Sequence, residues 1–100
     1  MDKFTVKLYS AAVNDLDGIY SYIASSLREP EVAEKLIDEL ENAIISLELF
    51  SERGPFRKIG SYAGRKYRQL FVKNFTIIYR IDEERKTVII VTVRYSPSSF

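Results

Sequence analysis

The sequence predicts a single α/β domain over residues 1–100, an α+β fold in which an antiparallel sheet of about four strands carries two N-terminal helices on one face. Two stretches in the first half place apolar residues at three- and four-residue steps, the spacing of an amphipathic helix. Shorter runs before and after them alternate in polarity or are rich in β-branched and aromatic residues, as strands are. With 46% apolar residues among 100, the chain can bury one modest core.

The two helices have starts and stops that the sequence marks. The alternating run Phe4–Tyr9 is expected to be a strand, and a helix beginning at Ala11 follows it. Pro30 cannot continue that helix but suits the first position of the next, so a tight helix–helix connection is expected there. The second apolar stripe runs to Phe50 and includes three residues expected to face the sheet: Leu36, Leu40 and Ile44.

The second half is expected to be a loop followed by three strands. Gly54 and Pro55 break the second helix, and residues 51–64 form a glycine-containing basic loop. The expected strands are Tyr67–Val72, Phe75–Ile81 and Val88–Tyr95. A two-residue turn at Lys73-Asn74 would pair Val72 with Phe75, Leu70 with Ile77 and Arg68 with Tyr79.

Charge is divided unevenly along the chain. Residues 1–52 carry four basic and eleven acidic side chains, net −7, whereas residues 53–100 carry eleven basic and three acidic, net +8, so the whole chain is +1. A small body made of these halves is expected to have a dipolar surface, with one face suited to an anionic partner. The alternative is that the halves neutralise each other across an internal interface.

The stretch from Arg53 to Ile81 contains eight basic residues and no acidic one. Arginine contacts phosphate bidentately and aromatic rings stack on unpaired bases, so arginines and tyrosines gathered at one end of the sheet would suit RNA. The residues expected to bind a nucleic acid or another target are Arg65, Lys66, Tyr67, Arg68, Arg80 and Arg94. The alternative is that Arg68 or Arg80 only extends along the sheet and keeps its charge in water.

The absence of histidine and cysteine narrows the chemistry. A zinc site of the usual kind and a thiolate nucleophile are excluded, and neither a metal site nor a cofactor is expected. Metal-independent RNA cleavage would still need a base, an acid and donors for the charged phosphate. The base would have to be a tyrosine such as Tyr95 or Tyr67, or a carboxylate such as Glu52 or Asp82.

Six motifs follow one another along the chain: TVKLYS, AAVNDLDGIYSYI, PEVAEKLIDELENAIISLELF, SERGP, GRKYRQLFVKNFTIIYRID and VIIVTVRY. In this order and spacing they resemble the RelE/ParE superfamily of bacterial type II toxins, and the similarity covers nearly the whole chain. The resemblance implies a RelE/ParE-like toxin domain over residues 1–100 that arrests growth. It also implies an acidic antitoxin, encoded together with the toxin, that wraps it and masks its working surface.

The two branches of this superfamily act differently: RelE-like members bind the ribosomal A site and cut mRNA, and ParE-like members inhibit DNA gyrase. In the mRNA-cleaving branch an arginine follows the aromatic residue that opens the hairpin's second strand, and here that position is Thr76. If the chain is a nuclease, the resemblance implies Arg68, Arg94 and Tyr95 as candidate catalytic residues.

The motifs DLDGIYSYI and SERGP look more like the ParE branch. The sequence therefore favours a gyrase inhibitor over a ribosome-dependent mRNA endonuclease that inhibits translation. A basic nucleic-acid-binding module without toxicity is the third hypothesis. The N-terminal run alternates in polarity where a signal peptide would be continuously apolar, and no stretch reaches membrane-spanning length, so a cytoplasmic protein without a membrane partner is expected.

Overall fold

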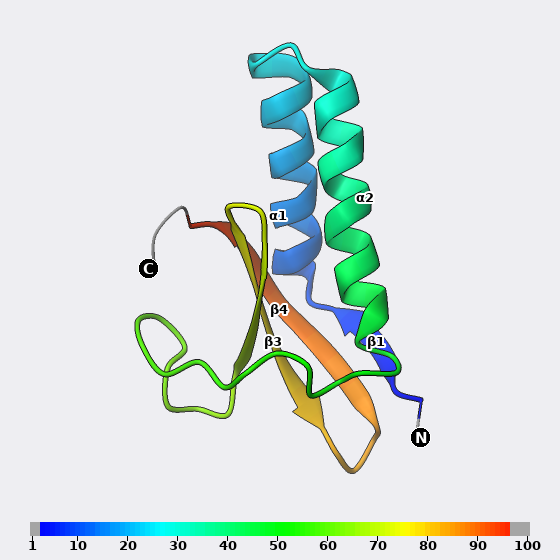
Figure 1. Ribbon diagram of the computed structural model, residues 1–100, viewed down its shortest axis with the longest axis vertical. Coiled ribbons are helices and arrows are strands. Elements are labelled where there is room, and N and C mark those ends of the chain that lie inside the picture. The colour runs from blue at the N-terminus through cyan, green and yellow to red at the C-terminus, as the bar shows by residue number, and fades with distance from the viewer. Residues whose placement is uncertain (1–2, 97–100) are drawn as a thin grey trace.

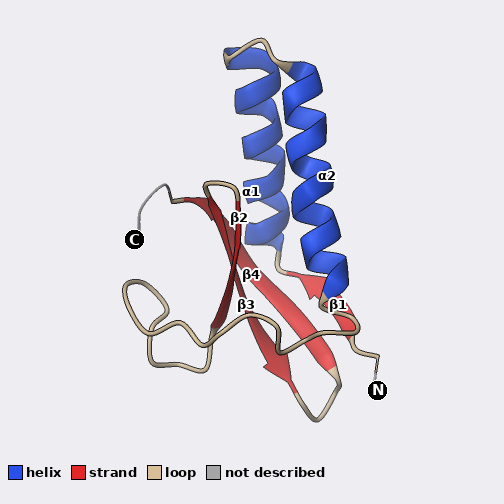
Figure 2. Cartoon of the chain, in the orientation of Figure 1, coloured by secondary structure: helices blue, strands red, loops and turns tan. Residues whose placement is uncertain are grey.

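The computed structural model describes residues 3–96, which form helices and strands in the order that the sequence predicts (Figures 1 and 2). Strand β1 leads into helix α1, which continues as a short π-helical segment, η1, and helix α2 returns alongside it. Three strands complete the chain. The elements are β1 (Thr5–Leu8), α1 (Ser10–Ser21), η1 (Tyr22–Ser26), α2 (Pro30–Ser46), β2 (Arg68–Val72), β3 (Phe75–Asp82) and β4 (Thr87–Tyr95).

The sheet has four strands in the order β1-β4-β3-β2. The predicted hairpin register is confirmed, since Val72 pairs with Phe75 and Arg68 with Tyr79 across an antiparallel β2–β3 ladder. Strand β4 is antiparallel to β3, but β1 runs parallel to β4. The sheet is therefore mixed, and the expectation of an antiparallel sheet is wrong for β1. That strand is joined to the others through two helices rather than a tight turn, so no hairpin dictates its direction.

One face of the sheet is covered by the helical hairpin, as predicted. Figure 1 shows α1 and α2 side by side, with the end of the hairpin that carries their connection extending beyond the sheet. Leu40 and Ile44 of α2 are buried and Leu36 is half-buried, which agrees with the stripe read from the sequence. The core that these helices share with the sheet consists of Ala12, Leu40, Ile44, Leu47, Leu70, Phe75, Ile77, Tyr79, Val88, Ile90 and Val93.

The other face of the sheet is covered by the segment between α2 and β2, residues 51–67. Phe56 forms a bridge with Arg68, and the Gln69 N–H donates to the Pro55 carbonyl at 3.0 Å, so this segment pairs along the outer edge of β2. It then folds onto the face opposite the helices. Thr76 and Ile78, which alternate with the core residues of β3, are completely buried there. We call residues 51–67 the wrapping loop and the face that it covers the loop face.

The start of the wrapping loop is held by Tyr79, which lies in the core. Its hydroxyl donates to the Ser51 carbonyl at 2.8 Å and accepts from the Gly54 N–H at 3.0 Å. Burial raises the pKa of this phenol above its ordinary value, so it stays protonated and able to donate. Gly54 is itself buried in this contact. A Cβ at residue 54 would lie 2.4 Å from the Gln69 carbonyl oxygen and 2.7 Å from the Tyr79 hydroxyl.

Helix α1 is tied to β4 by one carboxylate. Asp15 Oδ2 accepts hydrogen bonds from the Thr92 hydroxyl at 2.5 Å and from the Val93 N–H at 3.0 Å. These two residues lie beside the point where the β3–β4 register shifts, at Ile78/Tyr79. Strand β1 pairs with β4 only as far as Ile90, so Asp15 supplies an acceptor to β4 beyond the last residue that β1 pairs.

We predict that Gly54→Ala lowers the free energy of unfolding by about 1–3 kcal/mol, because backbone and a buried ring must move to admit the methyl group. Gly18→Ala is the matched control: nothing lies within 4 Å of a Cβ there. Since residue 18 is inside α1, this control should stabilise the protein by about 0.5–1 kcal/mol. Urea unfolding of both variants tests the contrast, and equal effects would contradict the crowding described at Gly54.

We predict that Asp15→Ala also destabilises the protein by about 1–3 kcal/mol, because it strands the buried Thr92 hydroxyl and Val93 N–H. Asp17→Ala, an exposed carboxylate removed from the same helix, should change stability by less than about 0.5 kcal/mol. Thermal unfolding of both variants at one pH makes the comparison. An equal loss of stability in both variants would mean that the effect comes from the charge of the helix and not from the contact with β4.

Candidate target-binding face

The structure divides the predicted site residues between the two faces of the sheet. Directly paired residues of antiparallel strands point to the same side. Arg68 pairs with Tyr79 of the helix-covered core, whereas Arg94 pairs with Thr76 on the loop face. Tyr95, which pairs with Phe75, lies on the helix side. The three candidate catalytic residues Arg68, Arg94 and Tyr95 therefore do not converge on one point.

The guanidinium of the half-buried Arg68 makes contacts with other groups of the protein. Nη1 donates to the Gly54 carbonyl at 2.8 Å and lies 3.3 Å from the Glu52 carbonyl oxygen. The guanidinium carbon lies 4.0 Å from the centre of the Phe56 ring, a cation–π contact. Arg68 thus anchors the first part of the wrapping loop, which is a sufficient physical reason for an arginine at this position.

Tyr95 is 64% exposed and packs edge-to-face on Phe75, with ring centres 5.5 Å apart. It lines a largely apolar hollow of about 740 Å³ between α1, η1 and the ends of β3 and β4. The hollow is lined by Asn14, Asp15, Gly18, Ile19, Tyr22, Ile23, Leu27, Phe75, Val93 and Tyr95. No cation lines this hollow among the described residues, but Tyr95 also borders a second hollow that Lys35 and Lys73 line.

The loop face gathers the other predicted residues. Arg94 is exposed and its guanidinium carbon lies 5.7 Å from the centre of the Tyr62 ring. The Tyr62 and Tyr67 rings meet edge-to-face at 5.2 Å. The exposed Arg65 and Lys66 lie in the same part of the wrapping loop. We call the following set the basic face: Arg57, Arg65, Lys66, Tyr67, Arg80 and Arg94.

Arg57 is the most buried cation of the basic face, with 4% of its surface exposed. Burial lowers its pKa from the ordinary value, and the positive charge of Arg94 lowers it further. The positive charge of Arg94 thus acts on the buried guanidinium of Arg57. Such an arrangement raises the positive potential of the surface and suits an anionic partner.

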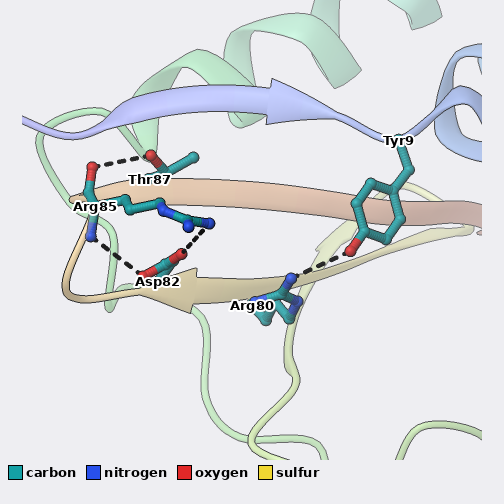
Figure 3. Close-up of polar contacts among 5 residues, drawn as sticks. All are labelled: Tyr9, Arg80, Asp82, Arg85 and Thr87. Carbon is teal, nitrogen blue, oxygen red and sulfur yellow. Dashed lines mark hydrogen bonds and ion pairs between the residues drawn. The ribbon is translucent and has the colours of Figure 1, made fainter.

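Arg80 extends the basic face toward the end of β1. Figure 3 shows its guanidinium directed at Tyr9, whose hydroxyl accepts a hydrogen bond from Nη2 at 3.1 Å. This hydrogen bond raises the pKa of Arg80, so it favours the charged form that an arginine already has. Farther along the hairpin, Asp82 accepts from the Arg85 N–H at 3.2 Å and pairs with the Arg85 guanidinium at 3.8 Å (Figure 3). Asp82, the last residue of β3, thus holds the β3–β4 turn.

Thr76 stands where the mRNA-cleaving branch has an arginine, and its side chain is fully buried. Its hydroxyl contacts the Ser96 hydroxyl. A phosphate therefore cannot approach Thr76 without opening the loop face. Within residues 3–96, no cluster of three carboxylates could hold a metal ion, and neither helix is long and apolar enough to cross a membrane.

Three residues of this surface were not among the predicted site residues: Tyr9, Arg57 and Tyr62. Arg57 belongs to the basic stretch in the sequence, so charge alone could have indicated it. Tyr9 and Tyr62 are each distant along the chain from the arginine that they contact, and neither carries a local signal. Only folding brings them to Arg80 and Arg94.

Known structures share this fold. A chain of the chromosomal ParDE toxin–antitoxin system from P. aeruginosa superposes with a TM-score of 0.77 at 22% identity, covering 94% of this chain and 97% of that one. A chain of the RelBE2 toxin–antitoxin complex from Mycobacterium tuberculosis gives 0.66 at 21% identity, covering 98% and 97%. The isolated E. coli RelE toxin gives 0.51 at 15% identity, covering 96% and 87%.

No curated protein matches the sequence significantly. A family model does: it describes the ParE toxin of type II toxin–antitoxin systems, parDE, and it matches residues 6–97. The predicted resemblance to the RelE/ParE superfamily is thus confirmed. The chain belongs to the ParE toxin family of type II toxin–antitoxin systems.

Proposed function

We propose that this toxin arrests growth by binding and inhibiting DNA gyrase, without catalysing a reaction. The observation that supports this most directly is that Arg68 and Arg94 point to opposite faces of the sheet. The membership of the ParE family agrees with it, since the resemblance described above implies gyrase as the target of that branch.

Metal-independent RNA cleavage needs its base, its acid and its phosphate donors around a single phosphate, each within hydrogen-bond reach. Here Arg68 donates to loop carbonyls, and Tyr95 lies over an apolar hollow on the other side of the sheet from Arg94. Thr76 cannot supply the missing charge, because a hydroxyl carries none and this one is buried. Binding of a target through a basic surface does not require these groups to meet at one point.

Ribosome-dependent mRNA cleavage is the second candidate function. It is favoured by the basic face itself, where Arg80 and Arg94 lie with Tyr67 and Tyr62 on one side of the sheet. Guanidinium groups and aromatic rings together are what phosphates and unpaired bases need. In this alternative Tyr67, rather than Tyr95, would be the residue placed to act as base.

We further propose that the physiological partner is an acidic antitoxin. It binds this toxin in the cytoplasm, and the toxin consists of one domain. The structures with the same fold include toxin–antitoxin complexes, which supports a partner of that kind. The charge of the chain supports its acidity, because the second half carries a net charge of +8.

We predict that induced expression of the chain alone stops bacterial growth, and that an acidic protein encoded beside it restores growth and copurifies with it. Growth curves and affinity purification provide the measurement. Unimpaired growth of several bacterial hosts at high levels of folded toxin would remove the basis for the proposal.

We predict that purified toxin inhibits gyrase supercoiling while ribosome-bound mRNA stays intact during growth arrest. Tyr95→Phe should behave as the wild type. Arg94→Glu should weaken inhibition several-fold, since an exposed charge contact is worth on the order of 1 kcal/mol. Arg85→Glu, the same reversal at the β3–β4 turn, is the matched control and should have little effect.

The deciding measurement maps mRNA ends on ribosomes beside the supercoiling assay. Cuts at defined codon positions that disappear in Tyr67→Phe would instead establish the nuclease alternative. Cuts that disappear in Tyr95→Phe would show that the two faces act together on RNA in a way that this geometry does not support.

A further inference from the structure

We propose that Arg57 is a positioning residue for target binding: its buried guanidinium holds the second half of the wrapping loop against the sheet and thereby sets the shape of the basic face. This inference rests on the proposed role of the basic face in toxicity. Arg57 itself is too buried to be the main contact with a target, since 4% of its surface is exposed.

The contacts of Arg57 connect both ends of the loop's second half. Nε donates to the Ser61 carbonyl at 2.6 Å, and Nη1 donates to Gln69 Oε1 of β2 at 2.8 Å. The backbone of Arg57 adds two more links, because its N–H donates to the Tyr67 carbonyl at 2.8 Å and its carbonyl accepts from the Gly64 N–H at 3.4 Å. One residue thus holds the turn at residues 61–64 and the strand edge together.

The backbone of this turn needs such support. Positive φ angles recur at Gly60 (81°), Tyr62 (69°), Gly64 (75°) and Lys66 (62°). Glycine adopts these angles freely, but in Tyr62 and Lys66 the side chain makes the left-handed region unfavourable. Residues other than glycine remain in such backbone conformations only where the surroundings hold them. The two residues held in this way are Tyr62, whose ring lies beneath Arg94, and Lys66 of the basic face.

Arg57 therefore determines where the exposed members of the basic face lie. Tyr62 packs on Tyr67 and beside Arg94, so displacement of the turn would move two aromatic rings and remove the support of one guanidinium.

The first part of the loop is held independently of Arg57. Tyr79 binds Ser51 and Gly54, and Arg68 binds the Gly54 carbonyl on the helix side of the sheet. A change at Arg57 should consequently loosen residues 57–66 and leave residues 51–54 in place. This separation makes a local effect distinguishable from general destabilisation.

The test combines amide hydrogen exchange with the toxin dose that stops growth. For Arg57→Met we expect exchange in residues 57–66 to accelerate at least tenfold while α2 and β3 keep their wild-type protection, and the dose for growth arrest to rise several-fold. Arg57→Lys, which keeps the charge but has no fork for two acceptors, should lie between Arg57→Met and the wild type. Arg53→Gln removes a charge from the exposed start of the loop and should match the wild type.

Full toxicity of Arg57→Met would overturn the inference, and so would unchanged exchange in the loop. Wild-type behaviour of Arg57→Lys in both measurements would overturn it as well, because a residue acting by charge alone is replaced by lysine. If Arg57→Met unfolds globally, Gln69→Leu decides: it keeps the arginine, removes its β2 acceptor and should loosen the same residues. Growth arrest is measured without reference to the target, so a toxin that fails to inhibit gyrase would refute the proposed function and leave this test intact.

Discussion

A four-stranded sheet has two faces to bury, and this chain has helices for only one of them. The remaining face contains apolar and polar side chains of β3 and β4, including the fully buried Thr76 and Ile78. The wrapping loop is therefore not a free connection: it must turn around the edge of β2 and cover that face. Most of the unusual contacts in the molecule follow from this requirement.

Three side chains hold the wrapping loop in place. Tyr79 binds its start from within the core, Arg68 binds the same region while packing on Phe56, and Arg57 binds its second half from the loop face. Pairing along the β2 edge also shields part of a strand that would otherwise present unpaired backbone groups. Arg68, which the sequence predicts as a binding residue, is thus also responsible for the fold, and so is Arg57 of the same basic stretch.

Because these arginines hold the loop in place as well as carrying charge, the site could be only partly predicted. The register of the β2–β3 hairpin is a local property, and it was predicted correctly from the two-residue turn at Lys73-Asn74. The face to which each arginine points depends on which side the helices cover. In addition, Tyr9 and Tyr62 are distant along the chain from the arginines that they contact, so no spacing rule links them.

The sequence by itself determined the number and order of the elements, the helix stripe through Leu40 and Ile44, and the family, because periodicity, turn residues and motif order are all written along the chain. The tertiary structure alone decided that β1 runs parallel to β4 and that Asp15 of α1 binds Thr92 and Val93 of β4. It also separated Arg68 from Arg94. The physical reason is common to all three: they depend on how the helical hairpin and the wrapping loop divide the two faces of the sheet, and that division comes from long-range packing rather than from neighbouring residues.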